Sequence, residues 1–292
     1  MTKLVCIPAY NEEKVIGDIV KRSLAHADKV IVCDDGSTDS TARVAKESGA
    51  TVISHKKNEG YGASIITLFD RAREEDADIM VTIDGDGQHN PDQIPLLVNT
   101  MQENNVDVVI GSRFLDKSSG TPGYRKQGIK IITSAANFGA DFKVSDAQSG
   151  FRAYSKNAIR SIRPTETGMS VSTEILLKIS NKGLALAEVP ITVSYDGDTS
   201  THNAVPHGVA VLMNTLKFIS VKHPIPFYGF PGIALVIAGS VIGYQFLDAY
   251  LHRQEIFLGS LMASIIFFLV GTILCVTAVL LYSMATLIRE KQ

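Results

Sequence analysis

The fold of this chain is indicated most clearly by the stretch IMVTIDGDGQ at residues 79–88. The apolar and β-branched residues at its start predict a buried strand, and the glycine-rich acidic segment after them predicts a turn. Residues 91–101 then repeat apolar side chains at helical spacing, with Asn90 as the cap and Pro91 at the first helical position. A strand, a polar loop and a helix in this order are typical of an α/β sheet.

Further β-branched runs in the first half of the chain predict the other strands of a parallel sheet, at residues 4–7, 30–33, 51–53 and 106–110. The amphipathic segments between them predict covering helices, the first of which is expected to open at Asn11 with Glu12 and Glu13 in its first turn. Ligands bind beyond the carboxyl ends of such strands. Polar clusters stand at three of these ends, so the sequence predicts a single cleft; the clusters are 8–12, 34–37 and 84–88.

Charged residues are distributed unevenly along the 292-residue chain, whose formal net charge is −2. This balance gives no reason to expect a nucleic-acid partner. Residues 225–247 and 256–288 contain no Lys, Arg or Glu. Each stretch exceeds the roughly 20 apolar residues that cross a bilayer as a helix. We therefore predict two C-terminal transmembrane helices, with a buried hairpin as the alternative.

Basic residues predict how these spans are oriented. Lys217 and Lys222 precede the first span, Arg289 and Lys291 follow the second, and the connecting loop contains only Arg253. Such a bias places both ends in the cytosol. The first residues also lack the basic and apolar regions of a signal peptide, which predicts a cytosolic amino-terminal domain.

These patterns predict three parts of the chain: an α/β domain at 1–206, a juxtamembrane amphipathic helix at 207–224 and a two-helix membrane anchor at 225–292. The amphipathic helix lies either at the membrane interface or on the sheet. Gly239 and Gly243 permit a close helix contact, with homo-oligomerisation as one outcome. The cysteines lack metal-ligand spacing and are expected to be buried, reduced thiols; they are Cys6, Cys33 and Cys275.

The acidic loop at 84–88 suits a divalent cation. Asp84 and Asp86 are separated by one glycine, and both carboxylates can turn toward Mg²⁺ or Mn²⁺, which favour carboxylate, phosphate and water oxygens. Gln88 can add a neutral oxygen. An Asp-Gly pair taken alone is more often a turn, but the position directly after a strand favours a metal site.

Two other strand ends carry side chains suited to a nucleotide. Asp34 and Asp35 can accept hydrogen bonds from a nucleobase or from ribose hydroxyls, while the turn after them can also cap the next helix. Arg113 follows another strand, and its guanidinium matches a phosphate. A surface salt bridge is the alternative for Arg113.

The motifs at these positions are IPAYNEE at 7–13, VCDDGSTD at 32–39, DGDGQ at 84–88, GSRF at 111–114 and DAQSGFR at 146–152. Together they resemble the family 2 glycosyltransferases, and in particular the polyprenyl-phosphate hexose synthases typified by dolichyl-phosphate mannose and glucose synthases. The resemblance covers roughly residues 3–208. It implies a GT-A fold, Rossmann-like with a mainly parallel sheet and flanking helices, a nucleotide sugar as donor, a lipid phosphate as acceptor, and inversion at the anomeric carbon.

Carried over residue by residue, the resemblance implies one site with three groups of side chains. They are Pro8, Tyr10, Glu12, Asp34, Asp84, Gly85 and Arg113 for the nucleotide sugar; Asp84, Asp86 and Gln88 for Mg²⁺ or Mn²⁺; and Asp86, Arg113 and Asp146 for catalysis. Asp146 is expected near the acceptor. There it orients that lipid, steadies a cation such as Arg152, or acts as a base.

The chain departs from the hexose synthases after the last sheet strand. Members of that group often have a basic residue there, but residues 195–202 contain no Arg or Lys, so His202 or His207 is the substitute we consider. The processive polysaccharide synthases share a Gln-x-x-Arg-Trp motif, and this chain has no Trp. That absence argues against polymerisation.

The resemblance, together with the two membrane spans, therefore implies a metal-dependent hexosyltransferase that forms a lipid-linked sugar for protein glycosylation at the cytoplasmic membrane face. A phosphate monoester is largely ionised at neutral pH and needs little help from a base. One alternative is a lipid hydroxyl acceptor, for which Asp146 would be an indispensable base. The other is an inactive membrane scaffold that binds nucleotide sugars.

Overall fold

A computed structural model describes residues 1–115, 129–130, 132–134, 136–137, 142–194, 213, 216, 220, 223–253 and 257–290, with side chains as far as 284. The chain forms two compact units, Met1–Thr215 and Leu216–Gln292. Most of the amphipathic helix expected at 207–224 lies outside the described residues, as do His202 and His207. The domain boundaries expected at 206 and 224 stay predictions.

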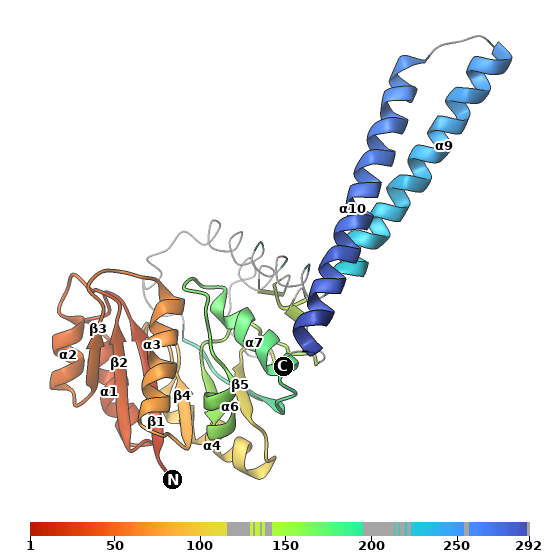
Figure 1. Ribbon diagram of the computed structural model, residues 1–292. Helices are drawn as coiled ribbons and strands as arrows, with labels where there is room; N and C mark the ends of the chain where they lie inside the picture. Colours follow the sequence, from red (N-terminus) through yellow and green to blue (C-terminus); the bar gives the residue numbers. More distant parts are fainter. Residues whose placement is uncertain are drawn as a thin grey trace. The chain divides into compact units, whose positions relative to one another are not determined.

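The first unit is built on a seven-stranded mixed sheet with the order β3-β2-β1-β4-β6-β5-β7 (Figure 1). Every strand predicted from the first half of the sequence is present. The strands are β1 Lys3–Ala9, β2 Lys29–Asp34, β3 Thr51–Ser54, β4 Ile79–Thr82, β5 Val108–Ser112, β6 Arg152–Ser155 and β7 Leu186–Pro190. The expected mainly parallel sheet is confirmed; the exception is β6, which lies between β4 and β5 and is antiparallel to both.

The buried strands supply two cores, one on each face of the sheet, because successive side chains point to opposite faces. Leu4 and Cys6 of β1 belong to the first core, and Val5 and Ile7 belong to the second. Helices α3, α6 and α7 cover the first core, and helices α1, α2 and α4 cover the second. Their bounds are α1 Ile16–Leu24, α2 Thr41–Glu47, α3 Tyr61–Glu74, α4 Ile94–Glu103, α6 Lys156–Ser161 and α7 Val171–Asn181.

The predicted start of α4 is confirmed, whereas the predicted start of α1 was wrong. The Asn90 side chain caps a short 3-10 turn, η1 Pro91–Gln93, by accepting from the backbone N–H of Asp92 at 3.0 Å, and α4 follows directly. Helix α1 begins only at Ile16. Asn11 has a φ of 57° and uses its side-chain oxygen to accept from the backbone N–H of Thr38 at 2.8 Å, so it joins two loops instead of capping a helix.

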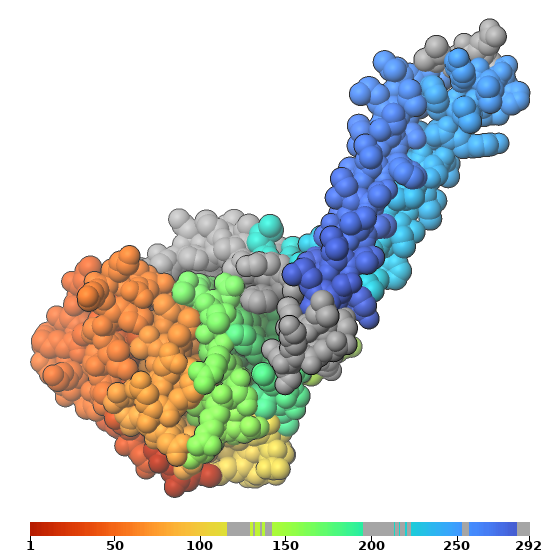
Figure 2. Space-filling model, viewed as in Figure 1, coloured from red at the N-terminus to blue at the C-terminus, as the bar shows by residue number. Residues whose placement is uncertain are grey.

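The second unit consists of η2 Ile225–Gly229, α9 Phe230–Arg253 and α10 Leu258–Glu290. Two segments, Ile225–His252 and Leu258–Met284, are long and apolar enough to cross a membrane. Most of their large apolar side chains are exposed, which disfavours the alternative of a buried hairpin. The two helices pack against each other and are the blue elements of Figure 2.

Small residues bring α9 and α10 into close contact. The hydroxyl of Ser264 donates to the carbonyl of Gly239 at 2.8 Å, and a Cβ added at Gly243 would lie 2.7 Å from that hydroxyl oxygen. A Cβ at Gly232 would lie 2.9 Å from the carbonyl oxygen of Gly271. The close contact predicted for Gly239 and Gly243 is therefore made within one chain, and homo-oligomerisation stays a prediction.

The cysteines are free thiols. Cys6 and Cys33 are buried in the first unit, as predicted, whereas Cys275 in α10 is only half-buried.

Candidate active site

The loops that follow β1, β2 and β4 meet at one edge of the sheet, where the sequence predicts a cleft. The backbone N–H of Asp35 donates to the carbonyl of Ala9 at 2.9 Å. The N–H of Asn11 donates to the hydroxyl of Ser37 at 2.9 Å. Gly85 lies so near the first loop that an added Cβ would come within 2.8 Å of the Pro8 carbonyl oxygen. These contacts bring the three polar clusters together.

Asp84 is held on several sides by residues from distant parts of the chain. The Tyr61 hydroxyl donates to its Oδ1 at 3.0 Å, and His89 Nε2 lies 3.4 Å from its Oδ2. Burial acts to raise the pKa of Asp84, but the hydrogen bonds from His89 and Tyr61 and the positive charge of Arg113 outweigh it and hold this pKa below its ordinary value. Asp84 is therefore an ionised carboxylate that is held by polar side chains.

Asp86 has a different environment. Its Oδ1 accepts from the backbone N–H of Gln88 at 3.0 Å, and burial together with the negative charge of Asp84 raises its pKa. A divalent cation between the two carboxylates would remove this repulsion, so the residues fit the metal that the family implies.

The two carboxylates alone are few protein ligands for a metal site. Among the described residues no group of three or more His, Cys, Asp and Glu side chains is arranged to hold a metal ion. Mg²⁺ is commonly bound through one or two carboxylates together with substrate phosphates and water. The further ligands would therefore come from Gln88, a diphosphate and water.

The two aspartates after β2 differ in how they are used. Asp35 accepts from His55 Nδ1 at 2.7 Å and from the backbone N–H groups of Glu59 at 2.9 Å and Gly60 at 2.8 Å. Its oxygens thus hold the chain that leads into α3. Asp34 accepts from the N–H of Ser37 at 3.2 Å and is the better candidate for a base or ribose contact.

A cysteine, a histidine and a carboxylate lie in line beside this site. Cys33 Sγ is 3.5 Å from His55 Nε2, and His55 Nδ1 bonds Asp35, which is the order of a cysteine nucleophile, its base and an orienting acid. The Cys33 side chain is fully buried, and burial is the main cause that raises its pKa to about 11. A buried, protonated thiol is inert, so we interpret the arrangement as structural.

Pro8 is buried, and Tyr10 and Glu12 are half-buried at the mouth of the loops. The backbone N–H of Glu12 donates to the Thr41 hydroxyl at 2.7 Å. Burial, followed by the negative charges of Asp86 and Asp39, raises the pKa of Glu12 to about 7. Glu12 therefore titrates near neutral pH.

We expect Glu12→Gln to stabilise the metal-free protein strongly at pH 8 and only slightly at pH 5. The folded pKa of Glu12, about 7, lies above the ordinary value of 4.5, so its stabilising contribution is present below pH 4.5 and is lost as the pH rises through 7. The cost of the ionised form is on the order of 2 kcal/mol after solvent screening. The stability difference is measured from the melting temperatures of the wild type and the variant in detergent at both pH values. An equal difference at pH 5 and pH 8 would contradict the assignment.

Arg113 is fixed by a buried carboxylate. Its Nε donates to Asp146 Oδ2 at 2.6 Å and one terminal nitrogen donates to Oδ1 at 2.8 Å, which is a bidentate pair. The Asp146 side chain is 0% exposed. Of the roles left open for Asp146, steadying a cation is the one with direct contacts, and the cation is Arg113 and not Arg152. Arg113 is also not a surface salt bridge, because its partner is buried.

The loop that carries Asp146 is itself anchored by Glu188 of β7. Glu188 accepts from the N–H and hydroxyl of Ser145, at 2.8 and 3.0 Å, and from the N–H of Asp146 at 3.3 Å. Sequence reasoning missed Glu188, because its position follows from the pairing of β7 with β5, which brings it beside Ile110.

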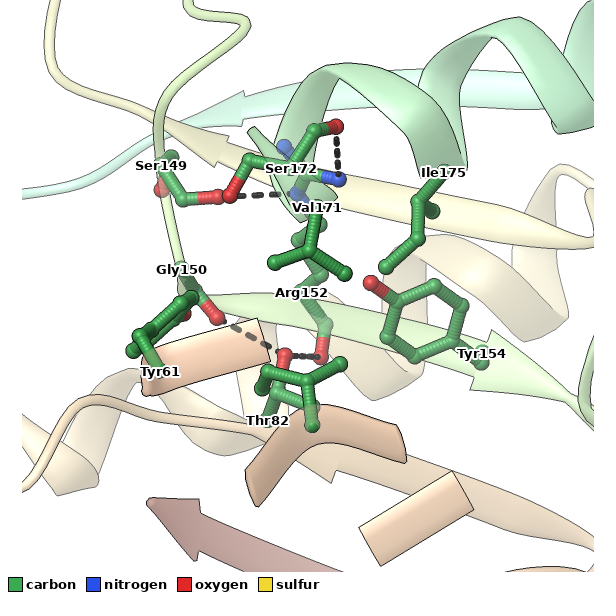
Figure 3. A pocket seen from close by; sticks show the side chains of 10 residues that line it. Tyr61, Thr82, Ser149, Gly150, Arg152, Tyr154, Val171, Ser172 and Ile175 are labelled. Atoms are coloured by element: carbon green, nitrogen blue, oxygen red, sulfur yellow. Dashed lines mark hydrogen bonds between the residues drawn. The ribbon is translucent and has the colours of Figure 1, made fainter. Parts of the chain in front are cut away.

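Arg152 lies in the interior, where it holds the loop after Asp146. Its guanidinium donates to the carbonyls of Ser149 at 2.8 Å, Ala147 at 2.8 Å and Ser172 at 3.1 Å. Figure 3 shows the small pocket beside it, which is also lined by Tyr61 and Gly150, the neighbours of Asp84. The Thr82 hydroxyl donates to the Gly150 carbonyl at 2.7 Å across this pocket.

Sequence reasoning also missed Tyr61, His89 and Gly150. A signal for His89 was available, since it directly follows the acidic loop. Tyr61 and Gly150 lie far from that loop in the sequence, and only the packing of α3 and of the turn before β6 brings them to Asp84.

The site thus combines a carboxylate pair after β4 with an arginine after β5, which lies two strands away in the same α/β sheet. The chain belongs to the glycosyl transferase family 2, which matches residues 4–163. It is therefore a glycosyltransferase, as the motifs indicated.

Relatives and solved structures agree with this assignment. The chain is 33% identical over 211 residues to the UDP-N-acetylglucosamine–dolichyl-phosphate N-acetylglucosaminyltransferase of Methanococcus voltae, covering 65% of this chain and 84% of that protein. It is 31% identical to the dolichyl-phosphate hexose transferase of Haloferax volcanii, covering 64% and 80%. Glucosyl-3-phosphoglycerate synthase of Mycobacterium tuberculosis, solved with Mn²⁺, UDP and glucosyl-3-phosphoglycerate, has a TM-score of 0.61 at 24% identity, covering 75% and 80%. The expected GT-A fold is thereby confirmed.

Proposed function

We propose that this protein transfers a hexose from a UDP- or GDP-linked sugar to a polyprenyl phosphate of the dolichyl type, at the cytoplasmic face of a membrane and with inversion at the anomeric carbon. The observation that carries the proposal is that Asp86 and the Asp146-bound Arg113 both lie close enough to Asp84 to act on its charge, in a chain that also has two apolar helices of membrane-spanning length. Relatives named for transfer to dolichyl phosphate support the acceptor.

The donor would be held from two sides. Pro8, Tyr10, Glu12 and Asp34 stand at the ends of β1 and β2 and would surround the nucleoside, while Gly85 lets the acidic loop approach the first loop closely. A Mg²⁺ or Mn²⁺ ion on Asp84 and Asp86, with Gln88, would neutralise charge on the departing diphosphate. Arg113, held in place by Asp146, would contact a phosphate.

The buried state of Asp146 favours a phosphate acceptor. A lipid hydroxyl would need a base within reach, but both Asp146 oxygens accept from Arg113 in the interior of the unit. A polyprenyl phosphate is already ionised at neutral pH and can attack the anomeric carbon unaided. Inversion would follow from attack opposite the departing diphosphate.

Orientation in the membrane is proposed from the sequence alone. Lys217, Lys222, Arg289 and Lys291 flank the spans and favour a cytosolic location for both ends. His202 and His207 remain candidates for a basic contact to the acceptor.

Purified full-length protein in detergent, incubated with a panel of nucleotide sugars and a polyprenyl phosphate, tests the proposal. We expect one labelled lipid product, formed with Mg²⁺ or Mn²⁺ and abolished by chelator. A product formed only on a lipid hydroxyl would support the alternative acceptor. Binding of UDP or GDP without any transfer would support the inactive scaffold.

We expect Asp146→Asn to lower kcat/KM by about 10- to 100-fold, because hydrogen bonds to charged groups contribute ~1.5–3 kcal/mol. Arg113→Ala should cause a larger loss, because it also removes the proposed phosphate contact, and the double variant should lose little more than Arg113→Ala alone, since Asp146 acts through Arg113. The acid limb of the pH–rate profile should be unchanged in Asp146→Asn. Loss of that limb would identify Asp146 as a base and contradict the pairing role.

A further inference from the structure

Each oxygen of the Asp84 carboxylate is contacted by a different side chain. Tyr61 donates to Oδ1 at 3.0 Å, and His89 Nε2 lies 3.4 Å from Oδ2. On a third side, a Cβ added at Gly150 would overlap both carboxylate oxygens. The Asp84 side chain is nevertheless 27% exposed, so one side stays open to solvent. Rotation about the bond to its carboxylate group, which is ordinarily soft, is therefore restricted.

Tyr61 is fixed by its own surroundings. It is the first residue of α3, and the N–H of the preceding Gly60 donates to Asp35 Oδ2 at 2.8 Å. Gly62 packs so tightly on the 166–168 segment that a side chain there would overlap the Glu166 carbonyl. The start of α3 is thus held from both sides, and the Tyr61 hydroxyl has a defined position.

His89 is equally confined, and one of its nitrogens is not satisfied. The residue is 5% exposed, its ring lies 5.4 Å from that of Phe151 between centroids, and its backbone pairs with Val193. Nδ1 is buried and has no hydrogen-bond partner within the described part of the chain. A buried polar atom without a partner costs free energy, so stability alone does not explain this ring. The contact of His89 with the Asp84 carboxylate explains the position of the ring, with the proton on Nε2.

We propose that Tyr61 and His89 are positioning residues, which hold the Asp84 carboxylate in the one orientation that a divalent cation uses. The inference rests on the proposed function, because it assumes that Asp84 and Asp86 bind that cation. Partners that orient a metal-binding side chain typically change metal affinity by about 10- to 100-fold when they are removed.

Mn²⁺ binding to the full-length protein in detergent, without nucleotide, tests this role through the paramagnetic resonance signal of free Mn²⁺. We expect Tyr61→Phe and His89→Phe each to raise the Kd by about 10-fold or more. His89→Gln should stay closer to the wild type, because its amide can donate from the position of Nε2. Tyr154→Phe is the matched control, since Tyr154 is 1% exposed and lines the same pocket without donating to Asp84. Turnover of Tyr61→Phe should recover at saturating Mn²⁺.

Asp84→Asn separates the two levels of the proposal. If it binds Mn²⁺ as tightly as the wild type, the cation does not use Asp84, and the metal site of the proposed function fails. If Asp84→Asn loses binding while Tyr61→Phe and His89→Phe bind like the wild type, the positioning role is overturned and the metal site stands. Tyr61→Phe removes one oxygen and keeps the ring, so it decides the question even if His89→Phe fails to fold.

Discussion

Asp86→Asn is expected to lower turnover by about 10³-fold, which corresponds to ~4 kcal/mol of lost transition-state stabilisation. Burial and the charge of Asp84 raise the pKa of Asp86, so this carboxylate has most to gain from a neighbouring cation. Asparagine keeps the size of the side chain and its acceptor for the Gln88 N–H but removes the charge that a divalent ion needs. The loss should therefore appear in kcat and in Mn²⁺ affinity together.

The matched control for Asp86→Asn is Asp18→Asn. Asp18 lies on α1 with a side chain that is 70% exposed, where it pairs only with Arg22 among the partners described. Turnover of this variant should equal that of the wild type. Near-normal turnover of Asp86→Asn, with unchanged dependence on chelator, would show that the metal is held elsewhere.

Gly150→Ala is expected to lower turnover by at least about 10²-fold, because a displacement on the order of 1 Å at a reacting centre has that effect. The added Cβ would overlap both oxygens of Asp84. The backbone has little freedom to retreat, since the Gly150 carbonyl accepts from the buried Thr82 hydroxyl at 2.7 Å. The carboxylate must move instead, away from Tyr61 and His89.

Gly168→Ala is the control for Gly150→Ala, because nothing lies within 4 Å of a Cβ added at Gly168. We expect wild-type turnover for Gly168→Ala and a higher Kd for Mn²⁺ in Gly150→Ala. Circular dichroism and melting curves of both variants show whether the fold is kept. Full activity of Gly150→Ala would mean that Asp84 is not a fixed ligand.

Local patterns allowed much of the sheet to be predicted. The strands before the polar clusters are continuous β-branched runs, and Asn90 and Pro91 form a start signal whose geometry is purely local. Strand β6 gives no such signal, because its four residues include Arg152, whose buried charge is satisfied by carbonyls from other segments. The predicted start of α1 was wrong for a related reason, since the Asn11 side chain accepts a hydrogen bond from a loop that is distant in sequence.

In the candidate site, too, local patterns predicted some features, while others depend on contacts between residues distant in sequence. The residues at strand ends could be named, because parallel strands deliver their carboxyl ends to one edge. Asp34 and Asp35 are neighbours of the same type, and only the three-dimensional contacts reveal that Asp35 is occupied by His55, Glu59 and Gly60. The role of Asp146 was open for the same reason, because its partner Arg113 is 33 residues away in the sequence.

The lengths of the two apolar helices have a consequence for where the chain meets the membrane. The spans contain 28 and 27 residues, so at about 1.5 Å per residue each is about 40 Å long. That exceeds the ~30 Å of hydrocarbon and matches the roughly 40–45 Å of a bilayer with its headgroups. Upright helices of this length would place Ile225 and Met284 in the same headgroup layer. The polyprenyl phosphate of the proposed function would carry its charge in that layer too, so the ends of the candidate spans and the proposed acceptor's phosphate would share one depth.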